Sequence, residues 1–387
     1  MRNTNAVSDE SDDGTDLDFV TAQFWKCNIK KKTKPTPMEN CDLKLETETK
    51  LCVRSRDTCS TRRTPDNTSV NILSLLSKRT LSGKCHQNVK RNILNNFLPK
   101  SPSVVAQYSH KVFCGNYCGV GGNTFMTASQ DCLIRLYDTQ QGNFALTETL
   151  EARDVGWSVL DVAVSHAGDC LVYSSWNENL HLVNLSSETG DKDRQHLPLP
   201  LAPDDVQFCL FCVTFSDDDS EIIGGSNDGC IYIYDRGVDR RTNQIHAHHA
   251  DVNTVCFMDQ NTNVLASGAD DGLCKIWDRR SLREDHPTPV GVLAGHVDGI
   301  AYISPKGDGR YLISNSKDQS IKLWDLRKFS NRDTVESGLR AVSGQRWDYR
   351  WQRVPKYVAK SRGVVTGDSS VMTYTGHTVL QTLIRYY

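Results

Sequence analysis

The 387-residue sequence has no apolar run near the ~20 residues that a helix needs to cross a bilayer. It also lacks an excess of either charge, because 45 Lys and Arg residues stand against 47 Asp and Glu residues. Such a chain carries no general basic surface for phosphate backbones. We therefore expect neither a membrane nor a nucleic acid among its direct partners.

The amino-terminal segment lacks the basic and then apolar order of a secretory signal. It reads MRNTNAVSDESDDGTDLD and is acidic and polar instead. The 14 cysteines are therefore expected to stay as thiols, and no Cys or His spacing indicates a metal or another cofactor. Residues 29–35 (IKKKTKP) are open to two interpretations, a nuclear import signal or a solvated tail. We expect the protein in the nucleus and cytoplasm.

Three regions differ in composition. Residues 1–67 hold few large apolar side chains, so we predict a disordered tail. Residues 68–98 carry two short apolar stripes that predict a pair of short helices, packed either on the neighbouring domain or in a partner's groove. From residue 104 to residue 387 the sequence changes to short alternating strands with Gly, Asn and Asp turns.

A decamer recurs through this last region. Its copies are SQDCLIRLYD (129–138), SWNENLHLVN (175–184), SNDGCIYIYD (226–235), ADDGLCKIWD (269–278) and SKDQSIKLWD (316–325). The copies end at 138, 184, 235, 278 and 325, so the intervals are 46, 51, 43 and 47 residues. This period, with its Trp-Asp ending, is typical of WD-repeat β-propellers. We predict an all-β propeller of five complete repeats plus the start of a sixth.

Two repeats carry the four polar positions that such blades join in a buried hydrogen-bonded chain from Asp to His to Ser to Trp. The two sets are His248, Ser267, Asp271 and Trp277, and His296, Ser314, Asp318 and Trp324. A His, a Ser and an Asp also suggest a hydrolase triad. A catalytic set occurs once and opens to a cleft, whereas this one repeats inside successive blades, which favours a structural role. No catalytic residue is predicted, and the chain is not expected to be an enzyme.

The Trp-Asp pairs of the fourth and fifth repeats continue as WDRR (277–280) and WDLR (324–327). Arg280 and Arg327 therefore follow the third strand of neighbouring blades and are expected on the lower rim. A guanidinium is a rigid fork of donors suited to a protein interface. Asp278 and Asp325, two residues earlier, are placed to hold it.

Paired Trp-Asp-x-Arg boxes resemble those of cullin 4 ubiquitin-ligase receptors. Several further stretches resemble the DDB1- and CUL4-associated factor 11 family: ARDVGWSVLDVA (152–163), YSSW (173–176), NDGCIYIYDR (227–236), YLISNSKDQSIKLWDLR (311–327), WDYRWQRVP (347–355) and GDSSVMTYTGHTVLQTLIR (367–385). The resemblance implies a non-catalytic substrate receptor. Its lower face and an amino-terminal helical element would hold the adaptor, damage-specific DNA-binding protein 1 (DDB1). Its upper face would present a protein for ubiquitination, with oxidative-stress transcription factors of the cap'n'collar type as substrate class. The alternative is a WD-repeat scaffold outside ubiquitin ligation.

An insert at residues 328–368 separates the fifth Trp-Asp pair from the next Gly-His. That interval is 52 residues, from 325 to 377, whereas in the fourth repeat it is 18, from 278 to 296. The insert holds nine Lys or Arg residues against four Asp or Glu residues. Its Trp347, Arg350 and Trp351 are residue types that dominate interfaces. We predict an adaptor-docking element on the lower rim beside the arginine pair, with a solvated loop as the alternative.

Blade-two turns supply the candidates for substrate contact on the upper face, Arg153, Trp157 and Trp176. Gly376 and His377 open a sixth repeat that the sequence does not complete. The family continues through further repeats, so we expect a shortened form whose open ring exposes strand edges and is only marginally stable.

Overall fold

The computed structural model describes residues 104–119, 122–140, 142, 144–185, 195–201, 208–259, 261–355, 358 and 365–380. The expected tail (1–67) and helix pair (68–98) lie outside this part of the chain. Within it, none of the helices has the length and apolar character needed to span a membrane.

The described chain forms five antiparallel four-stranded sheets in sequence order. The first blade contains β1 (Val112–Cys118), β2 (Thr124–Ser129), β3 (Leu133–Asp138) and β4 (Ala145–Glu151). The second contains β5 (Val159–Val164), β6 (Cys170–Ser175), β7 (Asn179–Asn184) and β8 (His196–Pro200). The third contains β9 (Leu210–Phe215), β10 (Glu221–Ser226), β11 (Cys230–Asp235) and β12 (Arg240–His246). The fourth contains β13 (Val252–Phe257), β14 (Val264–Ala269), β15 (Leu273–Asp278) and β16 (Gly291–Ala294). The fifth contains β17 (Ile300–Pro305), β18 (Tyr311–Ser316), β19 (Ser320–Asp325) and β20 (Met372–Thr375), with helix α4 (Arg332–Ser343) between its last two strands.

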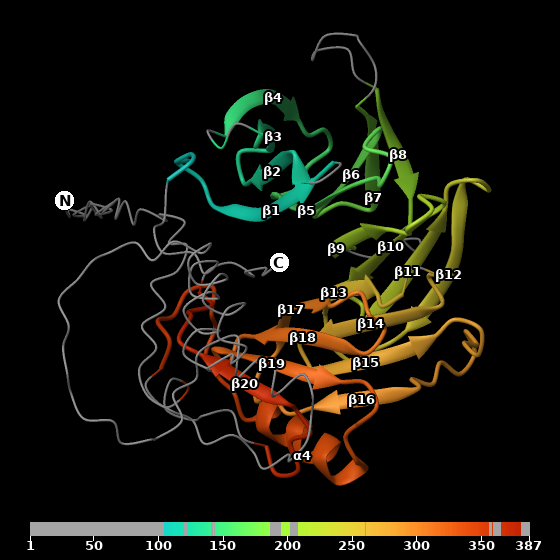
Figure 1. Ribbon diagram of the computed structural model, residues 1–387, viewed down its shortest axis with the longest axis vertical. Coiled ribbons are helices and arrows are strands. Elements are labelled where there is room, and N and C mark those ends of the chain that lie inside the picture. The colour runs from blue at the N-terminus through green and yellow to red at the C-terminus, as the bar shows by residue number, and fades with distance from the viewer. Residues whose placement is uncertain are drawn as a thin grey trace, which may run out of the picture.

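The blades follow one another in an arc, from the first at the top of Figure 1 to the fourth and fifth in its lower half. The innermost strands β1, β5, β9, β13 and β17 each contact the next along this arc. Each decamer of the sequence supplies the turn between the second and third strands and the whole of the third strand. The prediction of a WD-repeat propeller with five complete repeats is therefore confirmed.

Tight turns allow each decamer to reverse direction. In the fourth blade Gly272 adopts a φ of +75°, which a side chain would disfavour, and Asp271 accepts the backbone N–H of Leu273 at 3.0 Å. The next residues alternate into β15 and pair with β14 in register, Leu265 opposite Trp277. The residues of one decamer are thus sufficient to specify the turn and the third strand of one β-hairpin.

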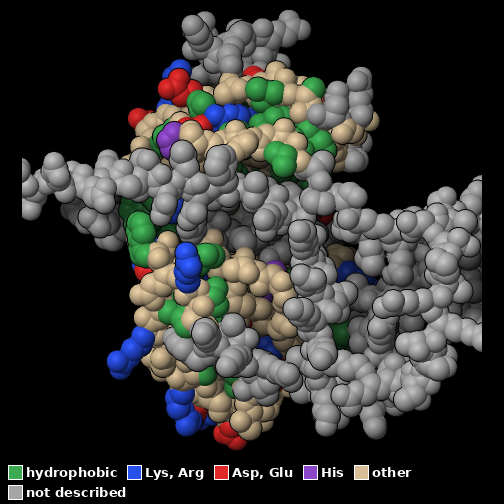
Figure 2. All heavy atoms as spheres, turned by 90° about the vertical axis from the view of Figure 1, so that its left-hand side faces the viewer, with side chains coloured by type: hydrophobic (Ala, Val, Ile, Leu, Met, Phe, Trp, Pro, Cys, Tyr) green, Lys and Arg blue, Asp and Glu red, His purple; other side chains and the backbone are tan. Residues whose placement is uncertain are grey.

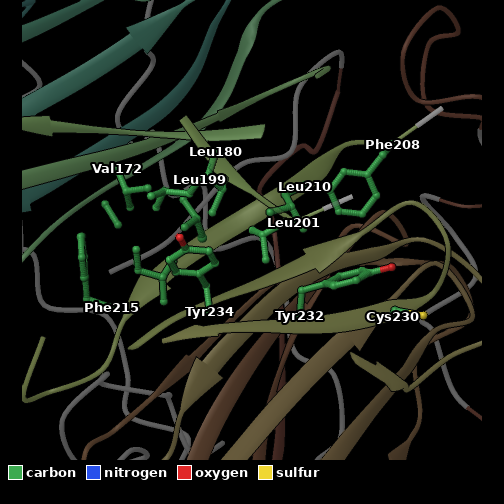
Figure 3. Packing of buried hydrophobic residues seen from close by; sticks show 13 residues of the cluster. Val172, Leu180, Leu199, Leu201, Phe208, Leu210, Phe215, Cys230, Tyr232 and Tyr234 are labelled. Carbon is green, nitrogen blue, oxygen red and sulfur yellow. The ribbon is translucent and has the colours of Figure 1, made fainter. Parts of the chain in front are cut away.

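The core lies between blades, not within one sheet. Figure 3 shows the cluster between the second and third blades, where Val172, Leu180 and Leu199 face Phe215 and Tyr234. Strands with a blade on both sides are buried almost throughout, as in β11. Strands of the first blade, at one end of the arc, are more exposed, with Tyr117 and Leu146 among the exposed large side chains.

Strand order assigns every loop to one of two faces, because antiparallel neighbours reverse direction. Loops from the first to the second and from the third to the fourth strand of a blade open on one face, called the lower face here. Turns from the second to the third strand, and links from one blade to the next, open on the opposite, upper face.

Candidate functional site

The polar sets of the fourth and fifth blades form the predicted buried chains. In the fifth blade His296 Nδ1 lies 2.9 Å from Asp318 Oδ2 and its Nε2 lies 2.6 Å from Ser314 Oγ, which accepts the Trp324 indole N–H at 2.7 Å. In the fourth blade the corresponding distances are 2.8, 2.8 and 2.9 Å, between His248 and Asp271, His248 and Ser267, and Trp277 and Ser267. Burial lowers the pKa of His248. These groups satisfy one another inside the blades. His248 and Trp277 also line a surface pocket beside Lys275, so it is the repetition of the set in both blades that favours a structural role.

Arg280 stands on the lower face and is held by one aspartate. Asp278 Oδ1 accepts the Arg280 backbone N–H at 3.0 Å and its Nε–H at 2.9 Å, while Oδ2 accepts Nη2–H at 2.7 Å. The Arg280 side chain is nevertheless 69% exposed. One edge of the guanidinium is thus fixed, and Nη1 donates to no described residue.

Arg327 repeats this geometry in the next blade. Asp325 accepts its backbone N–H at 3.1 Å, its Nε–H at 3.1 Å and its Nη2–H at 2.7 Å, and the arginine side chain is 60% exposed. Asp325 itself is buried and also accepts from Arg310 at 3.3 Å. The expected support of each arginine by its aspartate is therefore present in both blades. We call this arrangement an Asp–Arg fork.

The residue between the two charged positions has a separate task that the sequence reasoning missed. Arg279 Nη1 and Nη2 donate to the two carboxylate oxygens of Glu221 at 2.6 and 2.7 Å. Glu221 begins β10, so this pair joins the fourth blade to the third. The two consecutive arginines of WDRR were the available signal in the sequence. Arg279 joins two blades, and Arg280 forms the exposed fork.

The insert leaves the lower face beside Arg327 and does not stay there. Phe329 lies over Gly291 at the start of β16, where an added Cβ would come within 2.2 Å of its ring. Helix α4 then contacts β16 and β15, and Val342 near its end approaches Gly272, on the upper face. The glycines leave room for a path along the outer edge of the fourth blade.

Residues 347–351, beyond α4, lie on the upper face. Trp347 Nε1–H donates to Asp298 Oδ2 at 2.9 Å, and Asp298 belongs to the link from β16 to β17. Lys317, in the turn between β18 and β19, places Nζ 4.5 Å from the centre of the Tyr349 ring. The prediction that Trp347, Arg350 and Trp351 lie beside Arg280 and Arg327 is therefore wrong. The position at which an insert begins does not determine the face that it reaches. Here the insert runs along the outer edge of the fourth blade from the lower face to the upper face.

The insert covers Asp298, and this burial changes the pKa of its carboxyl group. Burial raises the pKa of its carboxyl to about 6, against the lowering effects of the Gly299 N–H, Lys317 and the Trp347 N–H. The neighbouring Asp270 accepts from Lys317 Nζ at 2.6 Å. The upper face thus has acidic groups beneath the insert that are bonded to it or to a lysine.

The insert contains a third Asp–Arg fork. Asp348 accepts the Arg350 backbone N–H at 2.9 Å, its Nε–H at 3.0 Å and its Nη2–H at 2.7 Å, and the arginine side chain is 61% exposed. These contacts match those of the two lower-face forks. The sequence signal was present, because WDYR (347–350) is itself a Trp-Asp-x-Arg box. Sequence reasoning missed Asp348, which holds this fork.

The blade-two candidates lie on the upper face, as expected. Arg153 and Trp157 belong to the link from β4 to β5, and Trp176 to the turn between β6 and β7. The two indoles meet edge to face at 6.5 Å, and they extend to Phe113 at 5.2 Å and Phe211 at 6.0 Å. Both tryptophans are about half-exposed, so part of this row is accessible on the surface.

Comparisons with known proteins agree with this architecture. Residues 206–235, 240–278 and 287–325 match the family described as WD domain, G-beta repeat. The chain is 38% identical over 347 residues to the DDB1- and CUL4-associated factor 11 homolog of Caenorhabditis elegans, covering 86% of this chain and 60% of that one. It is 36% identical over 335 residues to the homolog of Caenorhabditis briggsae (83% and 59%) and 36% identical over 318 residues to the LEC14B protein of Lithospermum erythrorhizon (80% and 64%). The chain therefore spans about three fifths of the length of these relatives.

Proposed function

Because this chain is a WD-repeat protein similar along most of its length to DDB1- and CUL4-associated factor 11 homologs, we propose that it is a receptor of the cullin 4 ubiquitin ligase. In this role it binds the DDB1 adaptor and performs no catalysis itself. The observation that carries the proposal is the pair of Asp–Arg forks on the lower face, centred on Arg280 and Arg327.

The forks suit a docking surface for a physical reason. An arginine side chain normally loses rotamer freedom on binding, which costs about 0.5–1.5 kcal/mol per immobilised side chain. Asp278 and Asp325 already fix Arg280 and Arg327 through three N–H groups each, so less freedom remains to be lost. The open Nη1 of each guanidinium supplies donors to a partner's carbonyl or carboxylate.

The upper face is proposed as the substrate side. Its support is the exposed aromatic row around Trp157 and Trp176, with Arg153 beside it in the same link. Aromatic and arginine side chains provide most of the binding energy of typical protein interfaces. The resemblance described above makes oxidative-stress transcription factors of the cap'n'collar type the first substrate class to test.

The test is a titration of purified DDB1 adaptor against the full 387-residue chain. Arg280→Ala/Arg327→Ala is expected to weaken binding by roughly 2–4 kcal/mol, the range of interface hot spots. Arg332→Ala/Arg340→Ala is the matched control, because these two α4 arginines are also exposed and lie in the insert. The control should bind as the wild type does.

Two outcomes would contradict the receptor role. Adaptor binding that survives the double substitution unchanged would remove the forks from the interface. A wild-type chain that folds cooperatively but does not bind the adaptor would favour the alternative of a WD-repeat scaffold outside ubiquitin ligation.

A further inference from the structure

A basic and aromatic strip is exposed on the upper face. Residues 346–353 read RWDYRWQR, and the exposed residues among them are Arg346, Arg350, Trp351, Gln352 and Arg353. Trp351 is the most exposed large apolar side chain of the described residues, at 81%. Trp347 and Tyr349 anchor the segment from below through Asp298 and Lys317. Arg346, Arg350, Trp351 and Arg353 together are called the basic strip.

The outward charge of the strip is positive. Arg346 and Arg353 form no ion pair with any residue that the structure describes. Arg350 is paired with Asp348, yet its Nη1 remains open to an acceptor. Asp270 and Asp298 lie only half-exposed beneath the insert, bonded to Lys317 and Trp347. In Figure 2, Lys and Arg side chains project from the lower half of the described surface, the half that holds the fourth and fifth blades.

The strip lies beside the point where the amino-terminal part of the chain joins the propeller. Lys111, which immediately precedes β1, places Nζ 5.6 Å from the centre of the Trp351 ring. It adds a fourth cation to the surface. Any segment amino-terminal to Lys111 is therefore tethered next to the strip.

The sequence contains an acidic segment of matching charge. Residues 9–18 (DESDDGTDLD) hold six Asp or Glu residues, and the nearest basic residues on either side are Arg2 and Lys26. Residues 19–103 join this segment to the described chain, and at about 3.3 Å per extended residue their length does not limit the reach. Tethering raises the effective concentration of the segment at the strip.

We propose that the basic strip is the docking site of this acidic segment, residues 9–18 of the same chain. The carboxylates pair with Arg346, Arg353 and the open edge of Arg350, and Trp351 packs against the apolar Leu17. An acidic segment of another protein can bind the strip only after displacing this one. The proposal is independent of the adaptor and of the lower face.

The test uses the full chain and a fluorescent peptide of residues 6–20, followed by anisotropy. In one variant the six acidic residues of 9–18 are replaced by Asn or Gln. The peptide should bind this variant about tenfold more tightly than the wild type, because the wild-type tail competes for the strip at high effective concentration. Equal affinity for the two chains would overturn the proposal.

A second comparison locates the site. In the chain with the neutral tail, Arg346→Glu/Arg350→Glu/Arg353→Glu should weaken peptide binding about tenfold or more through like-charge contacts. Arg332→Glu/Arg340→Glu on α4 changes the net charge of the same insert by four units and should stay within about twofold, whereas Arg346→Glu/Arg353→Glu, which also changes it by four units, should still weaken binding. Equal losses of peptide affinity in both double variants would mean that only the overall charge of the insert matters, and would overturn the assigned site. Trp351→Ala, which alters no charge, should also weaken binding and serves if the triple variant does not fold.

Discussion

The indole N–H of Trp347 donates to the carboxylate of Asp298 at 2.9 Å, across 49 residues of sequence. This bond ties the middle of an insert that begins on one face of the propeller to the opposite face. It also places an ionisable group under the insert, where burial raises the pKa of Asp298 to about 6.

The raised pKa predicts a specific dependence of stability on pH. The folded state holds the Asp298 proton more tightly than the unfolded state, whose pKa is near 3.8. This contribution is fully present below pH 4 and is lost as the pH rises through 6. Asp298→Asn has no such loss, although its single amide oxygen can replace only one of the two carboxylate oxygens that accept from Gly299 and Trp347, a cost that does not depend on pH. Its free energy of unfolding relative to wild type should therefore rise by about 2 kcal/mol between pH 4 and pH 7.

Urea unfolding at pH 4, 5, 6 and 7 measures this difference. Taking the variant against the wild type removes the contribution of other groups, such as His377, whose pKa burial lowers to about 4 and whose effect on stability has the opposite sign. A difference that is constant across this range would show that Asp298 titrates as an ordinary surface carboxylate.

The two lower-face aspartates should separate docking from stability. Asp325→Ala removes a buried acceptor and leaves Arg310 without its partner, so we expect a loss of about 2–4 kcal/mol in the free energy of unfolding. Asp278→Ala lies at an exposed pair and should leave stability nearly unchanged. Both should weaken adaptor binding, because each frees its arginine. Thermal melts and adaptor titration of the two variants, run together, would refute the fork argument if Asp278→Ala bound as the wild type does.

Ser314 is expected to be a costly residue to lose. Its hydroxyl serves both His296 Nε2 and Trp324 Nε1, so Ser314→Ala leaves two buried nitrogen atoms without a partner. We expect a loss of about 3 kcal/mol in the free energy of unfolding. Ser337→Ala on the exposed side of α4 is the control and should change it little. Similar losses for both variants would argue against a structural role for the polar chain.

Gly272 should report on the docking of the insert. Gly272→Ala and Gly307→Ala both place a side chain at a positive φ, +75° and +81°, which costs about 1–2 kcal/mol each. Only at Gly272 would the new Cβ also meet Val342, at 2.6 Å, whereas at Gly307 it meets open space. Gly272→Ala should therefore lose more stability and speed tryptic cleavage in the insert. Equal cleavage rates for both variants would mean that α4 is not held by this contact.

Features encoded within one repeat could be predicted from the sequence. The turn at Gly272, the buried set around Ser314 and the forks at Arg280 and Arg327 depend on residues a few positions apart, or on one blade interval. Each repeat brings the same residue types to equivalent positions in its blade. Once the period is recognised in the sequence, the positions of all these residues in the fold follow. Strand direction then assigned Arg280 and Trp176 to opposite faces.

The path of the insert could not be predicted in this way. It depends on space at the outer edge of the fourth blade, where Gly291 accommodates Phe329 and Gly272 accommodates Val342. Those contacts join segments 38 to 70 residues apart, and no periodic pattern links them. Arg279 was missed for a similar reason, since its partner Glu221 lies in another blade.

His296 lies in the link before the fifth sheet, yet it completes the hydrogen-bonded set of that sheet. A segment cut at the strand boundaries would therefore separate the histidine from the Asp, Ser and Trp that it serves. The segment to exchange in a chimera or a graft therefore does not coincide with the four strands of one sheet. It begins earlier, at the Gly-His pair in the link that precedes the sheet. Recombinants joined at Gly295 should retain intact blades, whereas those joined at Ile300 would inherit a blade without its own histidine.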